Sequence, residues 1–526
     1  MMLVWLILVP AIGGLLAALA ARGGERWCRW VSLAATLVQL AMVAWIWAAG
    51  PSAWHAAPGG AMRFSAEWIP QIGASFSLAL DGLSLVLIAL TAVLGVLSVA
   101  ASWRSVQKRL GFFHFNLLWS LAAVTGVFLA EDLLLFYLFW EMILVPMYFL
   151  IRVWGHENRV YAATKFFLFT QGGGLLLLLG ILAVYFIHGR SAGVYTFDFR
   201  QLIGTAAPPA AALWLMLAFF AAFAVKLPVI GLHTWLPDAH TQAPVAGSVV
   251  LAGLVLKVGA YGILRFVAAL FPAAAGQFAP VAMWLGAAGV IYGAMMACGQ
   301  NNLKRLVAYT SVSHMGFVLI GAFAGNSLAL QGTVVLMLAH GLATGGLFIM
   351  AGMVHERLGT YDMREMGGLW APLPRIGGAS MALAMATLGL PGLGNFVGEY
   401  LVLQGAWRSQ PAVAAVAAGG LVLSAVYSLR MMQRVFFGRP GRRRDLTDAI
   451  PRETAMAAGL IALLLWLGLY PRTFIRAVGS GIAVPAMPLM GKSLGPLTGT
   501  PMPLMGKSLG PLTGMPMPPA PAGGDQ

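Results

Sequence analysis

The chain has 526 residues, of which 60% are hydrophobic and only 9% are charged. Water-soluble domains carry about 25% charged residues, so this composition excludes a protein whose whole surface faces water and indicates lipid as the main solvent. The formal net charge is +15, but the cations stand in short loops between apolar runs, which favours membrane topology over nucleic-acid binding as their explanation. Cys28 and Cys298 belong to no CxxC or metal-spaced cluster, so no metal site is expected.

Apolar runs of transmembrane length recur along the chain as far as residue 475. A helix crosses the hydrocarbon with about 20 residues. The first run has no cation before it and three arginines after it, so we expect a retained helix rather than a secretory signal. We predict an all-α polytopic membrane protein of about fourteen transmembrane helices, at residues 3–21, 30–49, 79–102, 110–130, 132–152, 165–187, 210–230, 243–270, 279–299, 304–323, 328–354, 376–407, 412–436 and 455–474.

The distribution of lysine and arginine between alternate loops predicts the orientation of these helices. With the N-terminus outside, 21 of the 32 cations fall on the cytoplasmic side and nine on the other. Lys304 and Arg305 are counted in the cytoplasmic loop before the tenth helix, and the remaining two, Lys226 and Lys257, lie within spans. This asymmetry predicts that both termini are extracytoplasmic.

The tail, residues 485–526, differs in composition from the rest. It is rich in Pro, Met and Gly, and MPLMGKSLGPLTG occurs at Met487 and again at Met502. Its GKS lacks the upstream glycine of a phosphate loop, so nucleotide binding is not expected. We predict a disordered segment without an assigned role.

Three ionisable residues interrupt the central apolar runs, although a charge at mid-span costs about 2.5–3.5 kcal/mol on insertion scales. Glu141 lies near the middle of its span, and Lys257 has about ten apolar residues on either side. Lys226 precedes Pro228, which should break the helix and leave carbonyls that need protein or a wet cavity. Burial disfavours the charged form of a lysine, which suits proton transfer. For Glu141 the alternative is a structural carboxylate that only holds two helices together. For Lys226 it is a lysine at a helix end whose side chain reaches the membrane surface.

Glu399 follows a second interrupted span. Pro391, Gly392 and Gly394 stand just before it, and the pattern matches the break beside Lys226. Two such spans in corresponding halves are typical of two inverted-topology repeats, each with a discontinuous helix, with the functional site at the repeat interface.

Histidines extend this set of buried ionisable groups. His314 and His340 lie within apolar spans, and His233 lies in the break after Lys226. Histidine titrates nearest to physiological pH, so we predict relay roles for these three, with His240 a weaker candidate; satisfied core histidines are the alternative. Alternating acids, amines and imidazoles suit proton hopping, whereas two buried acids suit a metal or sodium site poorly.

Four segments resemble the antiporter-like membrane subunits of respiratory complex I: FWEMILVPMYFLI, KLPVIGLHTWLPDAHTQAPVAGSVVLAGLVLKVGAYGILRF, NNLKRLVAYTSVSHMGF and GLPGLGNFVGEYLVL. The resemblance covers residues 1–475 and implies a first repeat at about 110–270 and a second at about 279–437. Glu399 differs from the lysine that chains L and N of that complex carry on their twelfth helix. The repeated tail departs from the family pattern.

The resemblance implies a function in a multi-subunit enzyme. Glu141 and Lys226 would form a pair, Lys257 would be the central proton carrier and Glu399 the ionisable residue on the exit side, with His233, His314 and His340 as connecting groups. Other subunits would supply FMN, iron–sulfur clusters and quinone, while this chain would carry no cofactor or redox centre. The expected partners are chains L and N, small membrane chains and lipid, in a bacterial inner membrane.

Three other readings remain open at this point. The chain could belong to an Mrp-type cation/proton antiporter or to a membrane-bound hydrogenase. It could also be a structural scaffold of a membrane arm, in which the buried charges only lock helices together.

Overall fold

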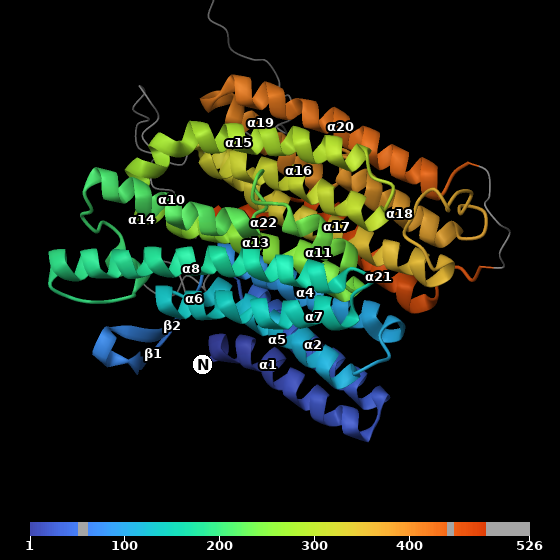
Figure 1. The fold of residues 1–526 in the computed structure, drawn as a ribbon, viewed down its shortest axis with the longest axis horizontal. Coiled ribbons are helices and arrows are strands. Elements are labelled where there is room, and N and C mark those ends of the chain that lie inside the picture. The colour runs from blue at the N-terminus through green and yellow to red at the C-terminus, as the bar shows by residue number, and fades with distance from the viewer. Residues whose placement is uncertain (51–61, 439–445, 480–526) are drawn as a thin grey trace, which may run out of the picture. The chain divides into compact units, whose positions relative to one another are not determined.

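The computed structural model describes residues 1–50, 62–438 and 446–479, and these are almost entirely helical (Figure 1). The predicted tail lies outside the described residues. The helices are α1 (Met2–Ala20), α2 (Glu25–Ala48), α4 (Gly82–Ser105), α5 (Leu110–Leu129), α6 (Leu133–Met142), α7 (Leu144–Trp154), α8 (Arg159–Ala192), α9 (Phe199–Leu202), α10 (Pro209–Lys226), α11 (Trp235–Gln242), α12 (Val245–Val250), α13 (Leu256–Gly262), α14 (Ala268–Leu270), α15 (Pro272–Cys298), α16 (Leu303–Phe323), α17 (Ser327–Leu358), α18 (Pro374–Thr387), α19 (Gly394–Ser409), α20 (Pro411–Val435), α21 (Pro451–Leu469) and α22 (Arg472–Gly479).

Thirteen helical stretches in the described part of the chain are long and apolar enough to cross a membrane. The remaining predicted span, the twelfth at residues 376–407, is present as two short helices, α18 and α19, with residues 388–393 between them. The all-α polytopic fold class is thus confirmed, and the difference in count comes from the predicted break.

The helices run roughly side by side (Figure 1), and their degree of burial differs strongly. The apolar window of α17 is 100% buried and those of α16 and of residues 245–270 are each 94% buried, whereas the window of α2 is only 28% buried. Helices at the periphery leave one face for lipid. The three innermost stretches are those that carry Lys257, His314 and His340.

The helix breaks arise where proline and glycine were expected to cause them. α10 ends at Lys226, and α11 begins nine residues later, after Pro228 and Gly231. Between α18 and α19, Gly389 and Gly392 adopt positive φ values of 84° and 95°, which glycine accepts readily.

One further break was not predicted, because residues 132–152 were expected to form one continuous helix. The structure interrupts this span at Ile143, between α6 and α7. Pro146 has no backbone N–H and cannot donate to the carbonyl of Met142, the last residue of α6, so the helical ladder weakens at that point. Glu141 therefore lies in the last turn of a short helix.

A β-hairpin is the second departure from the predicted elements. β1 (Met62–Ile69) pairs antiparallel with β2 (Ala74–Leu80), with a register shift between Glu67 and Ile69. Asp132, the N-cap of α6, accepts a hydrogen bond of 2.9 Å from the backbone N–H of Ser75 and so ties the hairpin to the bundle.

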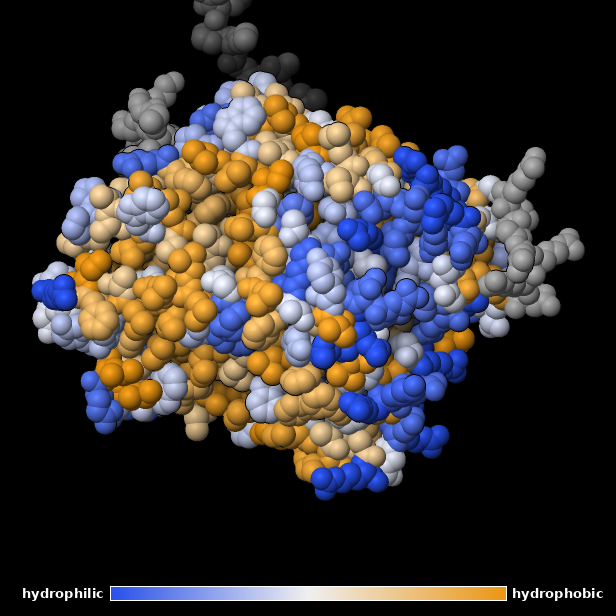
Figure 2. All heavy atoms as spheres, in the orientation of Figure 1, coloured by the Kyte–Doolittle hydropathy of each residue, from blue (hydrophilic) through white to orange (hydrophobic). Residues whose placement is uncertain are grey.

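Hydrophilic side chains gather at one end of the visible face, and an apolar region covers much of the remainder (Figure 2). The α1–α2, α7–α8 and α17–α18 connections lie at this hydrophilic end (Figure 1). They are among the connections predicted to carry the excess of cations. The orientation of the termini across a membrane stays a prediction.

Candidate functional site

Lys257 lies on α13 at the centre of the bundle, between two π-helical segments, Leu251–Val255 and Ile263–Val267. Its side chain is completely buried, and Nζ donates to the carbonyl of Ala252 at 2.5 Å. This carbonyl belongs to the first π-helical segment. Nζ also lies 2.6 Å from Nδ1 of His340 on α17. The amine and the imidazole are therefore in direct hydrogen-bond contact.

His340 leads from Lys257 towards His314 and Glu399. The rings of His340 and His314 lie with their centroids 5.5 Å apart, and Nε2 of His340 has no hydrogen-bond partner. Nδ1 of His314 lies 2.7 Å from Oε1 of Glu399, and its Nε2 lies 3.4 Å from the hydroxyl of Tyr427 on α20. The structure thus connects Lys257, His340, His314 and Glu399 into one row of buried groups, which we call the buried axis.

Glu399 enters the axis from the first turns of α19, just after the helix break. Its second carboxylate oxygen, Oε2, has no hydrogen-bond partner although the side chain is 2% exposed. A Cβ placed on Gly389 would lie 2.9 Å from this oxygen, so the positive-φ glycine of the break leaves room for the carboxylate. A buried polar atom without a partner is costly in a static structure, and it suits a group that exchanges protons.

Lys226 forms a second centre at the end of α10. Nζ donates to the carbonyl of Trp140 at 3.1 Å and lies 3.5 Å from the centroid of the Trp140 ring. The ammonium group is thus held by a hydrogen bond and a cation–π contact. α13 packs closely against the last turn of α10, because a Cβ on Gly259 would lie 2.7 Å from the backbone nitrogen of Leu227.

Glu141 neighbours Trp140 but does not bind Lys226 directly. No salt bridge joins Glu141 and Lys226 in the described part of the chain, and Oε1 of Glu141 has no hydrogen-bond partner. The two groups act on one another electrostatically without a direct contact. The carboxylate instead lies against the bare backbone of Gly174 on α8, where an added Cβ would come within 1.8 Å of Oε1.

His233 lies apart from the buried axis. Its ring packs edge-on against Tyr292 of α15 at 5.0 Å, and Nδ1 has no partner. No hydrogen bond between the described side chains links it to Lys226 or to Lys257. Its relay role is therefore a prediction without a connecting contact.

Sequence reasoning placed Lys304 in a water-facing loop, and this placement was wrong. Lys304 is completely buried, donates to the carbonyl of Ala243 at 2.5 Å and lies 5.2 Å from the Tyr361 ring centroid. Asn302 caps α16 by accepting from the backbone N–H of Arg305, so Lys304 already belongs to the helix. The capping asparagine is the signal that could have revealed this.

His240 was predicted to be only a weaker relay candidate, but the structure buries it completely, near two buried lysines. Both ring nitrogens lack hydrogen-bond partners, the side chain is completely buried, and the ring stacks on Phe348 at 4.8 Å. Lys304 and Lys257 are both near enough to act on it electrostatically. No hydrogen bond between described side chains joins the His240 ring to either lysine.

His156, a histidine outside the predicted spans, lies at the same end of the bundle as Lys304, since both are close to the ring of Tyr361. The ring of His156, in the loop between α7 and α8, lies 5.4 Å from those of His355 and Tyr361. Burial, then the positive charge of Lys304, lower the pKa of His156 to about 4. His156 is therefore neutral at physiological pH.

The fold and the site define a class of protein: a polytopic membrane protein that holds ionisable side chains in connected positions at the centre of its helix bundle. Among the described residues, no group of three or more His, Cys, Asp or Glu is arranged to hold a metal ion. Residues 130–425 match the family described as NADH:quinone oxidoreductase/Mrp antiporter, transmembrane. The chain belongs to this family and is a multi-pass membrane protein.

Two similar relatives are both named NADH-quinone oxidoreductase subunit M. The one from Pseudomonas aeruginosa is 52% identical, with 90% of this chain and 95% of the relative covered. The one from Escherichia coli K12 is 49% identical, with 92% and 97% covered. These names confirm the family resemblance of the sequence motifs.

Solved structures agree with this family. A chain of respiratory complex I from Thermus thermophilus with bound NADH is 30% identical, with a TM-score of 0.82 and 92% of this chain and 99% of that chain covered. A chain of the Mrp complex from Dietzia sp. has a TM-score of 0.80 with 92% and 96% covered, but at 23% identity it shows only a shared fold.

Proposed function

We propose that this chain is a proton-translocating membrane subunit of an NADH–quinone oxidoreductase. The observation that carries the proposal is the buried axis, in which Lys257, His340, His314 and Glu399 follow one another with contacts of 2.6 Å, 5.5 Å between ring centroids, and 2.7 Å. The names and extent of coverage of the relatives support the same assignment.

The geometry supports proton transfer along this axis. A neutral imidazole accepts a proton on one nitrogen and releases another from the opposite one. Lys257 passes its proton to Nδ1 of His340, and the unpartnered Nε2 of His340 then releases a proton to His314, whose ring is the neighbouring one. Glu399 then receives the proton from His314 and releases it on the exit side.

Lys304 and His240 provide the uptake stage in this proposal. They lie between the hydrophilic end of the bundle and Lys257, and His240 has two free ring nitrogens to exchange protons. Buried polar groups without protein partners commonly bind water, which would complete the connection from His240 to Lys257.

Glu141 and Lys226 control Lys257 electrostatically. Two opposite charges about 5 Å apart interact by about 3 kcal/mol at an effective dielectric constant of 20, and this attraction falls as the charges separate. When a movement draws Glu141 away from Lys226, the negative charge no longer offsets the positive charge of Lys226. The repulsion between Lys226 and a protonated Lys257 then increases, and this favours release of the Lys257 proton. Partner subunits of the membrane arm would drive this movement with redox energy, and flavin, iron–sulfur and quinone chemistry belongs to them.

The test is a comparison of His340→Gln and Glu399→Gln in the assembled oxidoreductase. We expect NADH oxidation to continue while proton uptake into inverted vesicles falls at least tenfold, because one carrier of the axis is missing. His188→Gln is the matched control, since His188 contacts Thr205 near the end of α8 and lies outside the axis. Unchanged pumping in both axis variants, with normal assembly, would support a scaffold instead. Sodium-dependent proton exchange without NADH oxidation would support an antiporter subunit.

A further inference from the structure

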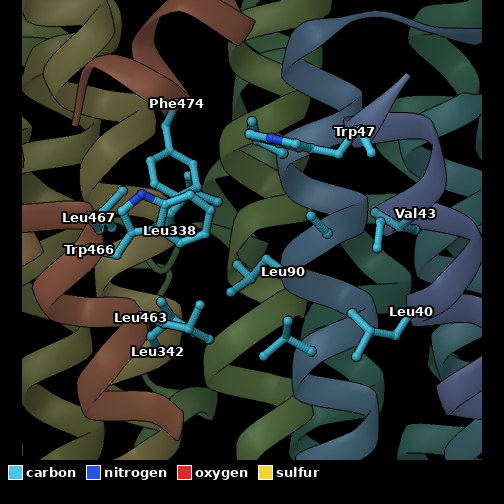
Figure 3. A pocket seen from close by; sticks show the side chains of 15 residues that line it. Leu40, Val43, Trp47, Leu90, Leu338, Leu342, Leu463, Trp466, Leu467 and Phe474 are labelled. Atoms are coloured by element: carbon cyan, nitrogen blue, oxygen red, sulfur yellow. The ribbon is translucent and has the colours of Figure 1, made fainter. Parts of the chain in front are cut away.

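An apolar groove opens between the peripheral helices α2 and α21. It has a volume of 280 Å³, and its fifteen lining residues come from α2, α4, α17, α21 and α22. Figure 3 shows Trp47, Val43 and Leu40 on one wall and Phe474, Trp466 and Leu463 on the other, with Leu90 of α4 between them. Polar ligands find no hydrogen-bonding side chain here apart from the two indole N–H groups.

The two outer walls are peripheral helices. The apolar windows of α2 and α21 are only 28% and 33% buried within this chain, so both helices present apolar faces beside the groove. The groove lies along the last third of α2 and the first half of α4, from residue 40 to 48 and from 86 to 93. It therefore runs from one membrane surface to about mid-depth, the depth range of an acyl chain.

α22 lies across the end of the groove and is amphipathic. Phe474 projects into the groove, and Ala477 packs against the start of α4, where a Cβ on Gly82 would overlap its carbonyl. Arg472 and Arg476, one helical turn apart on the opposite face, are exposed, and no ion pair joins either to a described carboxylate. Such helices lie at the headgroup level, where their cations meet anionic lipids.

We infer that this groove binds one acyl chain of an anionic phospholipid, with the headgroup held beside Arg472 and Arg476. Trp47 and Trp466 stand at the groove's outer end, the depth that indole rings prefer. A non-helical protein segment is a poorer occupant, because its peptide groups would be buried without partners in an apolar cavity. The site is independent of the proposed proton function.

The test uses the assembled complex in membranes with phosphatidylglycerol that carries a diazirine in one acyl chain. After irradiation, we expect label on peptides of α2, α4 and α21, and at least fivefold less in Ala44→Phe, whose ring fills the groove. Ala41→Phe is the matched control, because Ala41 is an exposed residue of α2 outside the lining. The double variant Arg472→Gln, Arg476→Gln should lose the preference for phosphatidylglycerol over phosphatidylcholine with the same label.

Three results would overturn the inference. Equal labelling of these peptides in Ala44→Phe and in the parent would show that the lipid probe does not enter the groove. A photoreactive phenylalanine at position 44 that captures a protein segment instead of lipid would show that a polypeptide occupies it. Equal labelling by both lipids in the parent would remove the anionic headgroup from the assignment.

Discussion

Gly174 offers a way to move the carboxylate of Glu141 without removing any charge. In Gly174→Ala, the new Cβ would stand 1.8 Å from Oε1 of Glu141, whereas real Cβ atoms essentially never approach closer than 3.0 Å. The carboxylate must therefore shift by about 1.2 Å. Because Glu141 is half-buried and its side chain is flexible, we expect it to rotate away rather than to unfold the site. Overpacking of this kind costs about 1–3 kcal/mol.

The proposed role of Glu141 is electrostatic, and a shift of about 1 Å between charges about 5 Å apart changes their interaction by about 0.6 kcal/mol at an effective dielectric constant of 20, which is about threefold in a rate. We expect proton pumping by Gly174→Ala to fall about two- to fourfold, measured as NADH-driven acidification of inverted vesicles, with normal amounts of assembled complex. Gly172→Ala on the same helix is the matched control, because nothing lies within 4 Å of its added Cβ. Parental pumping by an assembled Gly174→Ala complex would refute the proposed role of the Glu141 position.

Three further predictions concern the axis and its uptake end. His314→Gln should lower pumping at least tenfold, because Glu399 loses its 2.7 Å contact with an exchangeable imidazole; pumping above half the parental rate would contradict this. Lys304→Gln should slow pumping several-fold in the same vesicle assay, whereas Lys108→Gln, at an exposed loop cation, should not; equal effects would show that burial of Lys304 is irrelevant. Because the folded-state pKa of His156 is about 4, below its ordinary 6.5, its contribution to stability is complete above pH 6.5 and is lost as the pH falls towards 4. His156→Gln should therefore flatten the acid dependence of thermal unfolding in detergent between these pH values, and an unchanged dependence would contradict the assignment.

The helix breaks and the buried charges were predictable because they depend on local properties. Proline and glycine act on the backbone where they stand, so the ends of α10 and α18 follow from Pro228 and from Gly389 to Gly392. A lysine ten residues inside an apolar run, such as Lys257, is buried whatever surrounds it. The break at Ile143 was missed because no proline or glycine marks the interruption itself. Its cause, Pro146, stands three residues further on, inside α7.

The partners of the buried charges were not predictable, because tertiary packing decides them. His314 and Glu399 are 85 residues apart, and Lys257 and His340 are 83 apart. The resemblance implied a Glu141–Lys226 pair, but the lysine binds the carbonyl and ring of Trp140. Lys304 was misplaced because its neighbours Arg305 and Asn302 are typical of a loop, although the asparagine caps a buried helix.

The two π-helical segments around Lys257 give its helix a freedom that a regular α-helix lacks. Each wide turn holds one residue more than an α-helical turn, so a wide turn that narrows at one end while another widens at the far end rotates the residues between by about 100°. The seven residues of α13 lie between two such turns. Such a rotation would turn the Lys257 side chain from one set of neighbouring residues to another, while the ends of the span keep their places in the membrane.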